Sequence, residues 1–318
     1  MKLFVTGAAG FIGSNYVRYV LEHSDDEVTV FDALTYAGNL ATLADLEDNP
    51  RFRFVKGDIR DRDAVREAMT GHDQVVHFAA ESHVDRSILD PDAFVSTNCG
   101  GTNVMCDVAR HLEVDRFLHI STDEVYGSIE EGSFAETDPL SPRSPYSASK
   151  AGSDLIALAY VETYGLPVVL TRSSNNFGPY QYPEKAIPLF VTNLMDGKNI
   201  PLYGDGLNVR DWCYVEDNCA GVDAVLRRGE IGEIYNIGAG NEITNRELVT
   251  KILDVLGLGE DRIDFVEDRL GHDRRYSISI AKSEALGWSP ARELDEALAA
   301  TVEWYQANRA WWEPLKQG

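Results

Sequence analysis

Tyr146 and Lys150 stand four residues apart in the segment YSASK, a spacing that suits acid–base chemistry. On a helix, residues four apart lie on the same face. At about 4 Å and an effective dielectric of about 20, a lysine ammonium favours a phenolate by about 4 kcal/mol before solvation losses. This corresponds to roughly three pKa units at most, so Tyr146 is predicted to act as a base near neutral pH.

Two adjacent acids, Asp123 and Glu124, follow the apolar segment 117–120 and the hydroxyl residue Thr122. In open α/β sheets, ligands bind at the carboxyl ends of strands. Like charges held close together raise one carboxyl pKa, which would give one acid and one base at neutral pH. The alternative interpretation is a surface turn with two capping acids.

Gly7, Gly10 and Gly13 form a G-x-x-G-x-x-G turn after the first apolar segment. Such glycines permit a tight turn and close backbone approach to a pyrophosphate, and the following helix offers free N–H groups. Asp32 lies nineteen residues after Gly13, where an acid binds ribose hydroxyls. A carboxylate there repels a 2′-phosphate, so the pattern favours NAD over NADP. Asp58 and Ile59 are predicted to flank the adenine, although an aspartate at that place can equally cap a helix.

The elements that must position these residues alternate along the first half of the chain. Short apolar runs without polar alternation predict parallel strands covered on both faces, at 3–5, 28–31, 52–55, 75–78, 117–120 and 168–170. Proline and capping signals predict helices over about 91–111 and 145–164 and one more that begins after Thr244. A last helix is expected over about 295–307.

The fold class is therefore α/β, with a Rossmann-type doubly wound parallel sheet and a smaller C-terminal lobe. From about residue 173 glycine and proline become frequent and the apolar runs shorten. We expect an NAD-binding domain over 1–172. The remainder, 173–318, is expected to be mainly a second, smaller lobe, with some segments returning to the main domain.

Several longer stretches carry a resemblance to a known family, namely FDALTYAGN, HFAAESHVDRSI, STDEVYGS, SPYSASKAGSD, RSSNNFGPYQYPEKAIPLF, PLYGDGLNVRDW, ITNREL and DRLGHDRRY. The chain resembles the extended short-chain dehydrogenase/reductases and, among them, the dTDP-glucose 4,6-dehydratases. STDEVYG discriminates most, since the 4-epimerases lack the Asp-Glu pair and the GDP-mannose dehydratases keep only the glutamate. Two positions depart from the family pattern: Ala8 stands where glycine is common, and Ala186 where leucine is usual.

This resemblance implies a hydro-lyase reaction on dTDP-glucose with NAD as a retained cofactor. Tyr146, assisted by Thr122 and Lys150, would take the C4 hydroxyl proton while the C4 hydride is stored. Glu124 would remove the C5 proton, Asp123 would protonate the departing C6 hydroxyl, and the hydride would return to C6. Two alternatives remain: a 4-epimerase or decarboxylase, which would not need Asp123, and a non-enzymatic NAD-binding regulator, which would tolerate loss of the catalytic residues.

The resemblance also implies binding residues. Beside the glycines and acids already named, those implied for the cofactor are Phe11, Ile12, Leu34, Thr35, Ala79, Ala80, Ser82, Thr97, Tyr146, Lys150 and Asn176. Those implied for the substrate are Ser82, His83, Thr122, Asn175, Lys185, Ala186, Pro201, Tyr203, Arg210, Asn245, Arg269 and His272. An arginine can bind a phosphate through two hydrogen bonds, although an isolated arginine or lysine is usually a solvated surface residue.

The charge balance bears on partners. With 29 basic and 52 acidic residues the net charge is −23, which argues against nucleic acid and anionic membranes. A diphosphate can still bind through local cations, because the Debye length is only about 8 Å at physiological salt. The four cysteines and seven histidines show no zinc or disulfide pattern, so no metal is expected.

The location and oligomeric state are further expectations. The chain shows no leader peptide and no apolar run long enough to span a membrane, so we expect a cytoplasmic protein. By the same resemblance, the helices at 91–111 and 145–164 are predicted to pair with their counterparts in a homodimer.

Overall fold

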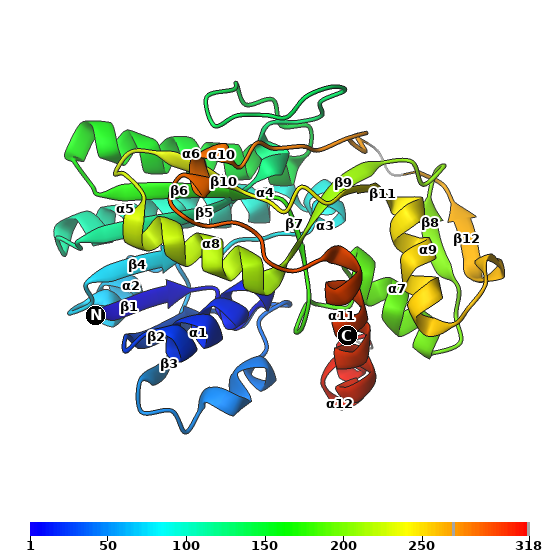
Figure 1. Ribbon diagram of the computed structural model, residues 1–318. Coiled ribbons are helices and arrows are strands. Elements are labelled where there is room, and N and C mark those ends of the chain that lie inside the picture. The colour runs from blue at the N-terminus through cyan, green and yellow to red at the C-terminus, as the bar shows by residue number, and fades with distance from the viewer. Residues whose placement is uncertain (269–270, 317–318) are drawn as a thin grey trace.

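Seven parallel strands form the centre of the computed structural model, which describes residues 1–268 and 271–316 (Figure 1). In chain order they are β1 (Lys2–Thr6), β2 (Glu27–Asp32), β3 (Phe52–Lys56), β4 (Gln74–His77), β5 (Arg116–Thr122), β6 (Val168–Ser173) and β10 (Ile234–Ile237). Their spatial order is β10-β6-β5-β4-β1-β2-β3. Every neighbouring pair is parallel.

The six strands predicted from the sequence are confirmed, and burial explains their composition. In β1 only Lys2 is exposed, and in β6 every residue is buried. A parallel strand covered on both faces has no solvent side, so it reads as an unbroken apolar run. The seventh strand, β10, was not predicted, because the run of Ile234 to Ile237 lies in the glycine-rich second half, far from its partner β6.

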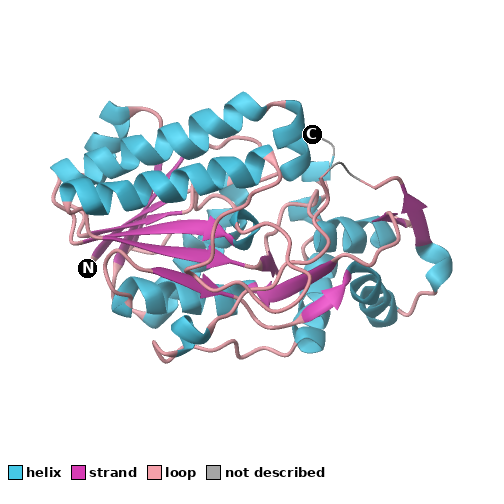
Figure 2. Ribbon diagram, turned by 90° about the horizontal axis from the view of Figure 1, so that it is seen from above, coloured by secondary structure: helices cyan, strands magenta, loops and turns pink. Residues whose placement is uncertain are grey.

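Helices cover both faces of the sheet, which Figure 2 shows between two helical layers. On one face α1 (Phe11–His23) packs against α8 (Val215–Arg228). On the other, α5 (Thr102–His111) packs against α2 (Arg62–Met69) and α6 (Pro145–Tyr164). Each layer encloses its own apolar core against the sheet. The predicted α/β Rossmann-type fold is confirmed.

The predicted helix starts are confirmed by their caps. Ser144 caps α6 just before Pro145, and Thr244 forms a capping box with Glu247 at α9 (Asn245–Leu256). The segment expected as one helix over 91–111 is α4 (Pro91–Phe94), a π-helical stretch (Val95–Gly101) and α5 in succession. In the π-helical stretch a Cβ on Gly101 would lie 2.4 Å from the Ile59 side chain, so glycine allows this close packing.

The C-terminal lobe, at the right of Figure 1, has a separate apolar core. Its helices are α7 (Ala186–Met195), α9, α11 (Leu294–Ala307) and α12 (Arg309–Trp312), and α3 (Val84–Leu89) and α10 (Ala281–Glu284) lie elsewhere. Its strands are β7 (Asn175–Phe177), β8 (Ile200–Tyr203), β9 (Val209–Tyr214), β11 (Glu242–Thr244) and β12 (Ile263–Val266). They form a β11-β9-β7 sheet and a β12-β8 pair. No helix in the described ranges combines the length and apolarity needed to cross a membrane.

Candidate active site

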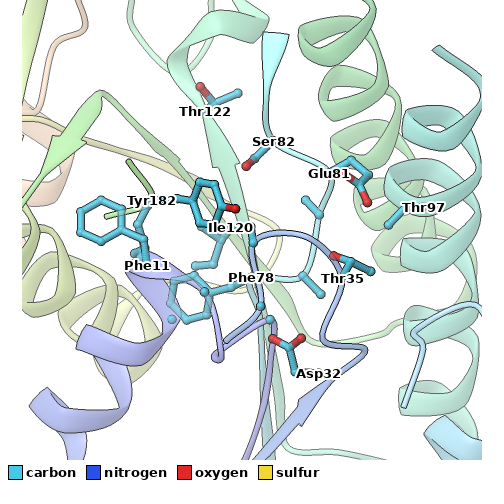
Figure 3. A pocket seen from close by; sticks show the side chains of 18 of the residues that line it. Phe11, Asp32, Thr35, Phe78, Glu81, Ser82, Thr97, Ile120, Thr122 and Tyr182 are labelled. Carbon is cyan, nitrogen blue, oxygen red and sulfur yellow. The ribbon is translucent and has the colours of Figure 1, made fainter. Parts of the chain in front are cut away.

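A cavity of about 470 Å³ opens at the carboxyl ends of β1, β2, β4, β5 and β6. Among its lining residues are many that the sequence singled out: Gly7, Gly10, Phe11, Ile12, Gly13, Asp32, Thr35, Asp58, Ile59, Ala79, Ala80, Ser82, Thr97, Thr122, Glu124, Tyr146, Lys150, Asn175, Asn176 and Lys185. Figure 3 shows Asp32 at one end of the cavity and Thr122 at the other. The structure therefore brings the glycine turn and the acid–base residues to opposite ends of one cavity.

The glycine turn lies between β1 and α1 and needs its glycines for two reasons. Gly7 has φ +72°, and a Cβ there would lie 2.5 Å from the backbone nitrogen of Ala79. A Cβ on Gly13 would lie 2.7 Å from Ala8 Cα. Ala8 itself is not among the described residues with positive φ, so its replacement of glycine strains nothing. The turn leaves a bare backbone cradle at the start of a thirteen-residue helix, which fits a pyrophosphate.

Substituting Gly7 tests this cradle. We expect Gly7→Ala to lower the free energy of unfolding by at least about 2 kcal/mol, because the left-handed backbone costs roughly 1–2 kcal/mol and the overlap with Ala79 adds to it. Urea denaturation would measure the loss. Gly71→Ala is the matched control, because Gly71 has φ +82° but nothing near its Cβ position. Equal losses of unfolding free energy in the two variants would show that the close contact with Ala79 adds nothing to the cost of the substitution.

Asp32 ends β2 with its carboxylate held in place. Its oxygens accept the N–H of Ala9 at 2.9 Å and of Leu34 at 2.8 Å. Burial raises the pKa of Asp32, and the two backbone hydrogen bonds oppose that rise. Each oxygen keeps a further acceptor position, which suits a ribose diol. Leu34 does not line the cavity by its side chain but adopts φ 55° to present its N–H to Asp32.

Asp58 and Ile59 line the same end of the cavity. Asp58 pairs with Arg60, whose Nη2 lies 2.6 Å from the Asp58 Oδ2, and this hydrogen bond lowers the Asp58 pKa. The alternative role of a helix cap does not apply, because Asp61 caps α2.

Tyr146 and Lys150 are both buried on α6. The Lys150 Nζ donates to the Ile120 carbonyl oxygen at 2.7 Å, and the Thr122 hydroxyl is hydrogen-bonded to Tyr146. Burial raises the pKa of Tyr146, the Glu124 charge adds to the rise, and the Thr122 hydrogen bond opposes it. Burial also lowers the pKa of Lys150 to about 8.

The prediction that Lys150 brings the pKa of Tyr146 toward neutrality is therefore wrong for this arrangement. Sequence spacing showed that the two side chains share a helix face, but it could not show how deeply both would be buried. Desolvation of the phenol is the largest influence on its pKa, and the Lys150 ammonium is hydrogen-bonded to the Ile120 carbonyl.

A buried ionic cluster behind Lys150 was not predicted. Asp154, one turn further along α6 and fully buried, lies 3.0 Å from Arg172 Nε and 3.3 Å from His119 Nε2. Burial opposes ionisation of Asp154, but these neighbours outweigh it and its pKa is lowered. Its charge in turn favours the ammonium form of Lys150. The i+4 spacing from Lys150 was the one available sequence signal.

The cost of burying Lys150 should be measurable. At 1.36 kcal/mol per pKa unit, a shift from 10.5 to about 8 corresponds to about 3 kcal/mol of destabilisation at neutral pH. Lys150→Met should therefore stabilise the fold by about 1–2 kcal/mol after losing the hydrogen bond to Ile120. The gain should shrink as pH rises from about 8 toward 10.5, since there the unfolded chain binds the proton and the native protein does not. Urea denaturation across this range, with exposed Lys251→Met as control, tests it; a less stable Lys150→Met at neutral pH would contradict the argument.

Asp123 and Glu124 form a short 3₁₀ turn after β5, and Thr122 fixes it. The Thr122 hydroxyl donates to Asp123 Oδ1 at 3.2 Å and accepts from the Glu124 N–H at 3.3 Å. Glu124 lines the cavity, whereas Asp123 is only 3% exposed and lies behind it.

The surroundings of Asp123 disfavour its ionised form. Burial raises the pKa of Asp123 well above its ordinary value, and the charges of Glu124 and Asp211 raise it further. Arg210 and the Thr122 hydrogen bond oppose this rise. Asp211 is held in place by the N–H groups of Ala239 at 3.0 Å and Asn241 at 2.7 Å. The sequence predicted one raised carboxyl pKa in this pair, and the structure places that rise on Asp123.

The residues predicted for the substrate fall into two groups. Ser82, Thr122, Asn175 and Lys185 line the cavity, and Lys185 Nζ donates to the Ser82 carbonyl at 2.8 Å. His83 caps α3, and the others sit on the C-terminal lobe outside the cavity lining: Ala186, Pro201, Tyr203, Arg210, Asn245 and His272. Arg269 lies outside the described residues.

The lobe residues nevertheless lie near one another. Arg210 stacks 4.1 Å from the ring of Tyr276, and its Nη2 donates to the Asp273 carbonyl at 2.8 Å. Asn245 begins α9 directly after β11, which pairs with the β9 segment that holds Arg210. The rings of Tyr203 and His272 are 6.3 Å apart.

Several cavity residues were missed by the sequence analysis. They are Phe31, Ala33, Tyr36, Arg60, Phe78, Glu81, Gln181, Tyr182 and Glu184 among others. Most lie in loops after strands, where the only signal was their position at the carboxyl edge of the sheet.

Comparisons with known proteins agree with this geometry. Residues 4–301 match the model of the GDP-mannose 4,6-dehydratase family. The chain is 56% identical to a dTDP-glucose 4,6-dehydratase of Streptomyces antibioticus, over 100% of this chain and 96% of the relative. It is also 56% identical to the low-salt glycan biosynthesis protein Agl12 of Haloferax volcanii, over 96% and 98% of the two chains. DesIV, a dTDP-glucose 4,6-dehydratase of Streptomyces venezuelae solved with NAD and dTDP bound, superposes with a TM-score of 0.97 at 55% identity, over 99% of this chain and 100% of that one. The chain therefore belongs to the GDP-mannose 4,6-dehydratase family, in the branch represented by the dTDP-glucose 4,6-dehydratases.

Proposed function

We propose that this protein is an NAD-dependent dTDP-glucose 4,6-dehydratase, which converts dTDP-glucose to dTDP-4-keto-6-deoxy-glucose. The observation that carries the proposal is the pair of acids at the end of the cavity that also holds Tyr146: Asp123, which is buried and has a raised pKa, beside the cavity-lining Glu124. A 4-epimerase moves one hydride at C4 and needs no second acid. A non-enzymatic NAD-binding protein needs none of these three groups.

The cofactor end of the cavity fits a dinucleotide. The bare turn at Gly7 and Gly10 suits the pyrophosphate, and Asp32 suits the ribose diol of NAD while disfavouring a 2′-phosphate. Lys150, buried at the opposite end with Tyr146, suits the second ribose. When bound, NAD supplies the acceptor for the C4 hydride and the donor that returns it to C6.

The residues of the chain then move the protons. Tyr146 takes the C4 hydroxyl proton, its oxygen is oriented by the hydrogen bond it shares with the Thr122 hydroxyl, and Lys150 stands one turn further along the same face of α6. The resulting C4 ketone makes the C5 hydrogen acidic. Glu124 takes that proton and later returns it to C5.

The leaving group departs with the proton of Asp123, as water from C6. Burial keeps Asp123 protonated, so that it can donate. One proton enters the protein at Tyr146 and one leaves at Asp123, so the net change in the sugar is the loss of one water molecule. Proton exchange with solvent resets both groups.

The substrate-binding residues support a division of labour between the two halves of the chain. We assign cofactor binding to residues 1–172 and nucleotide-sugar binding mainly to 173–318. Asn175 and Lys185 reach the cavity from the second half, and Arg210 and Asn245 on the lobe are the groups that suit a diphosphate. The positive charges of Lys185 and Arg210 offset locally the net charge of −23 that the chain carries.

The test uses dTDP-glucose deuterated at C4, incubated with the purified protein and no added NAD. Deuterium in the C6 methyl group of a 4-keto product is expected, because the hydride is stored and returned within one active site. Mass spectrometry and NMR would locate the label. Deuterium remaining at C4 of an epimerised sugar would point to a 4-epimerase instead, and unchanged substrate with NAD-loaded protein would overturn the proposal.

We also infer a cytoplasmic homodimer formed through α6 and the helical stretch of residues 91–111. Large apolar side chains are exposed on these two segments, namely Val95 (55%), Leu155 (61%) and Tyr164 (53%), and Leu89 (85%) is exposed just before the first of them. Light scattering is expected to give twice the chain mass for the wild type and the single chain mass for Leu155→Asp. Leu258→Asp, on an exposed position of the lobe, is the control that should remain dimeric. A wild type of single chain mass would contradict the dimer.

A further inference from the structure

Three segments far apart in the sequence meet beside the cavity. They are the loop after β2 with Tyr36, helix α3 with Arg86, and the loop after β7 with Tyr182 and Glu184. Arg86 connects them: its guanidinium carbon lies 3.8 Å from the centre of the Tyr36 ring, and its Nε lies 3.2 Å from Glu184 Oε2. The rings of Tyr36 and Tyr182 are 5.8 Å apart in an edge-to-face arrangement.

The members of this group differ in how they face the cavity. Tyr36, Tyr182 and Glu184 line it, and Figure 3 shows the Tyr182 side chain at the cavity. Arg86 is not among the lining residues, and its side chain is 47% exposed. Arg86 therefore ties two walls of the cavity together from the outside, without needing to touch what the cavity holds.

A second tie runs parallel to the first. Lys185, next to Glu184, donates to the Ser82 carbonyl at 2.8 Å. Ser82 lies just before α3, the helix that contains Arg86, so both ties reach the same segment. The loop after β7 is thus fastened to the α3 segment at two points, and Arg86 also links that segment to Tyr36 through a cation–π contact. Loss of the Arg86 guanidinium would remove the cation–π contact from Tyr36 and leave Glu184 without this ion pair.

We propose that Arg86 is a positioning residue that holds the cavity closed around the dinucleotide, so that the cofactor stays on the enzyme between oxidation and reduction. The inference rests on the proposed function, because a hydride that is stored and returned requires the same cofactor molecule to remain bound. We call Tyr36, Arg86 and Glu184 the cavity clamp. Its ties are an exposed ion pair and a cation–π contact, each a modest interaction, so the clamp can open slowly without making release impossible.

The test measures cofactor release directly. Arg86→Met keeps the aliphatic stem but loses the charge and the planar group, and Glu184→Gln removes only the charge of its partner. Purified proteins would be loaded with radiolabelled NAD and chased with unlabelled NAD, and the bound label followed by gel filtration. Release is expected to be about tenfold faster in Arg86→Met, the change that corresponds to about 1.4 kcal/mol of lost closure. At saturating NAD, kcat should stay near the wild-type value.

A matched control exists elsewhere on the surface. Arg292 also pairs with a glutamate at 3.2 Å, Glu216, and lies 5.8 Å from a tyrosine ring, that of Tyr214, but none of these three residues lines the cavity. Arg292→Met should release NAD at the wild-type rate. A rise in Arg292→Met equal to that in Arg86→Met would overturn the inference, since it would reflect general loosening.

The outcomes separate this inference from the proposed function. Wild-type protein that binds no NAD would refute the proposed function. If the wild-type protein retains NAD, and both Arg86→Met and Glu184→Gln release NAD at the wild-type rate, the cavity clamp is refuted and the proposed function stands. If Arg86→Met fails to fold, Glu184→Gln decides the question by itself.

Discussion

Replacing Asp123 with asparagine is expected to lower kcat by about 10²–10⁴-fold, the usual loss when a general acid is removed. Asparagine has the shape of the protonated acid but cannot give up a proton to the departing C6 hydroxyl. Oxidation at C4 does not use this proton, so the variant should still consume bound NAD. Rapid mixing with substrate should show reduced nicotinamide by its absorbance, while the 4-keto-6-deoxy product accumulates slowly.

The pH dependence of the same variant gives a second measurement. The folded pKa of Asp123 is raised above its unfolded value, so the native protein holds this proton more tightly. The resulting stability is present at low pH and is lost as pH rises through the folded pKa. Asp123→Asn should therefore flatten the fall in unfolding free energy over that window. An unchanged kcat, or a variant that cannot reduce bound NAD, would contradict the role given to Asp123.

Tyr146→Phe is expected to lower kcat by a similar factor of about 10²–10⁴, but at the first step. Without the phenol the group assigned to take the C4 hydroxyl proton is missing, so no rapid formation of reduced nicotinamide should appear after mixing. The absence of this signal distinguishes the variant from Asp123→Asn. In the wild type, burial raises the Tyr146 pKa, so the rate should increase with pH until the phenolate forms, and this limb should vanish in Tyr146→Phe.

The control for this variant is Tyr16→Phe. Tyr16 is also buried, and its hydroxyl lies 3.3 Å from Asp223, but it does not line the cavity. The Tyr16→Phe substitution removes one buried phenol hydroxyl, and no loss of kcat is expected from it. Accumulation of reduced nicotinamide in Tyr146→Phe at the wild-type rate would exclude Tyr146 as the base.

Local spacing accounts for most of what the sequence predicted correctly. The unbroken apolar runs of the six predicted strands, the capping box at Thr244 and the proline start of α6 are each encoded within a few residues, so no knowledge of distant contacts was needed. The same holds for Gly7 to Asp32, since a strand, a tight turn and a helix place these residues at one edge of the sheet. The pairing of Tyr146 with Lys150 on one helix face follows from the helical repeat alone.

Burial and long-range contacts decided the rest. The sequence could not place β10 beside β6, because sixty residues of chain, 174–233, lie between the two strands. It gave Tyr146 a lowered pKa where burial raises it, because desolvation depends on what packs around the phenol and not on its neighbours in the helix. It could not show that Asp123 lies behind the cavity while adjacent Glu124 lines it, nor that Asp154 meets His119 and Arg172 beneath Lys150. The sequence by itself thus determined which chemical groups stand at the carboxyl ends of the strands. Only the tertiary structure decided the pKa values of these groups and the closure of the cavity by Arg86. Both depend on atoms that packing brings together from distant parts of the chain.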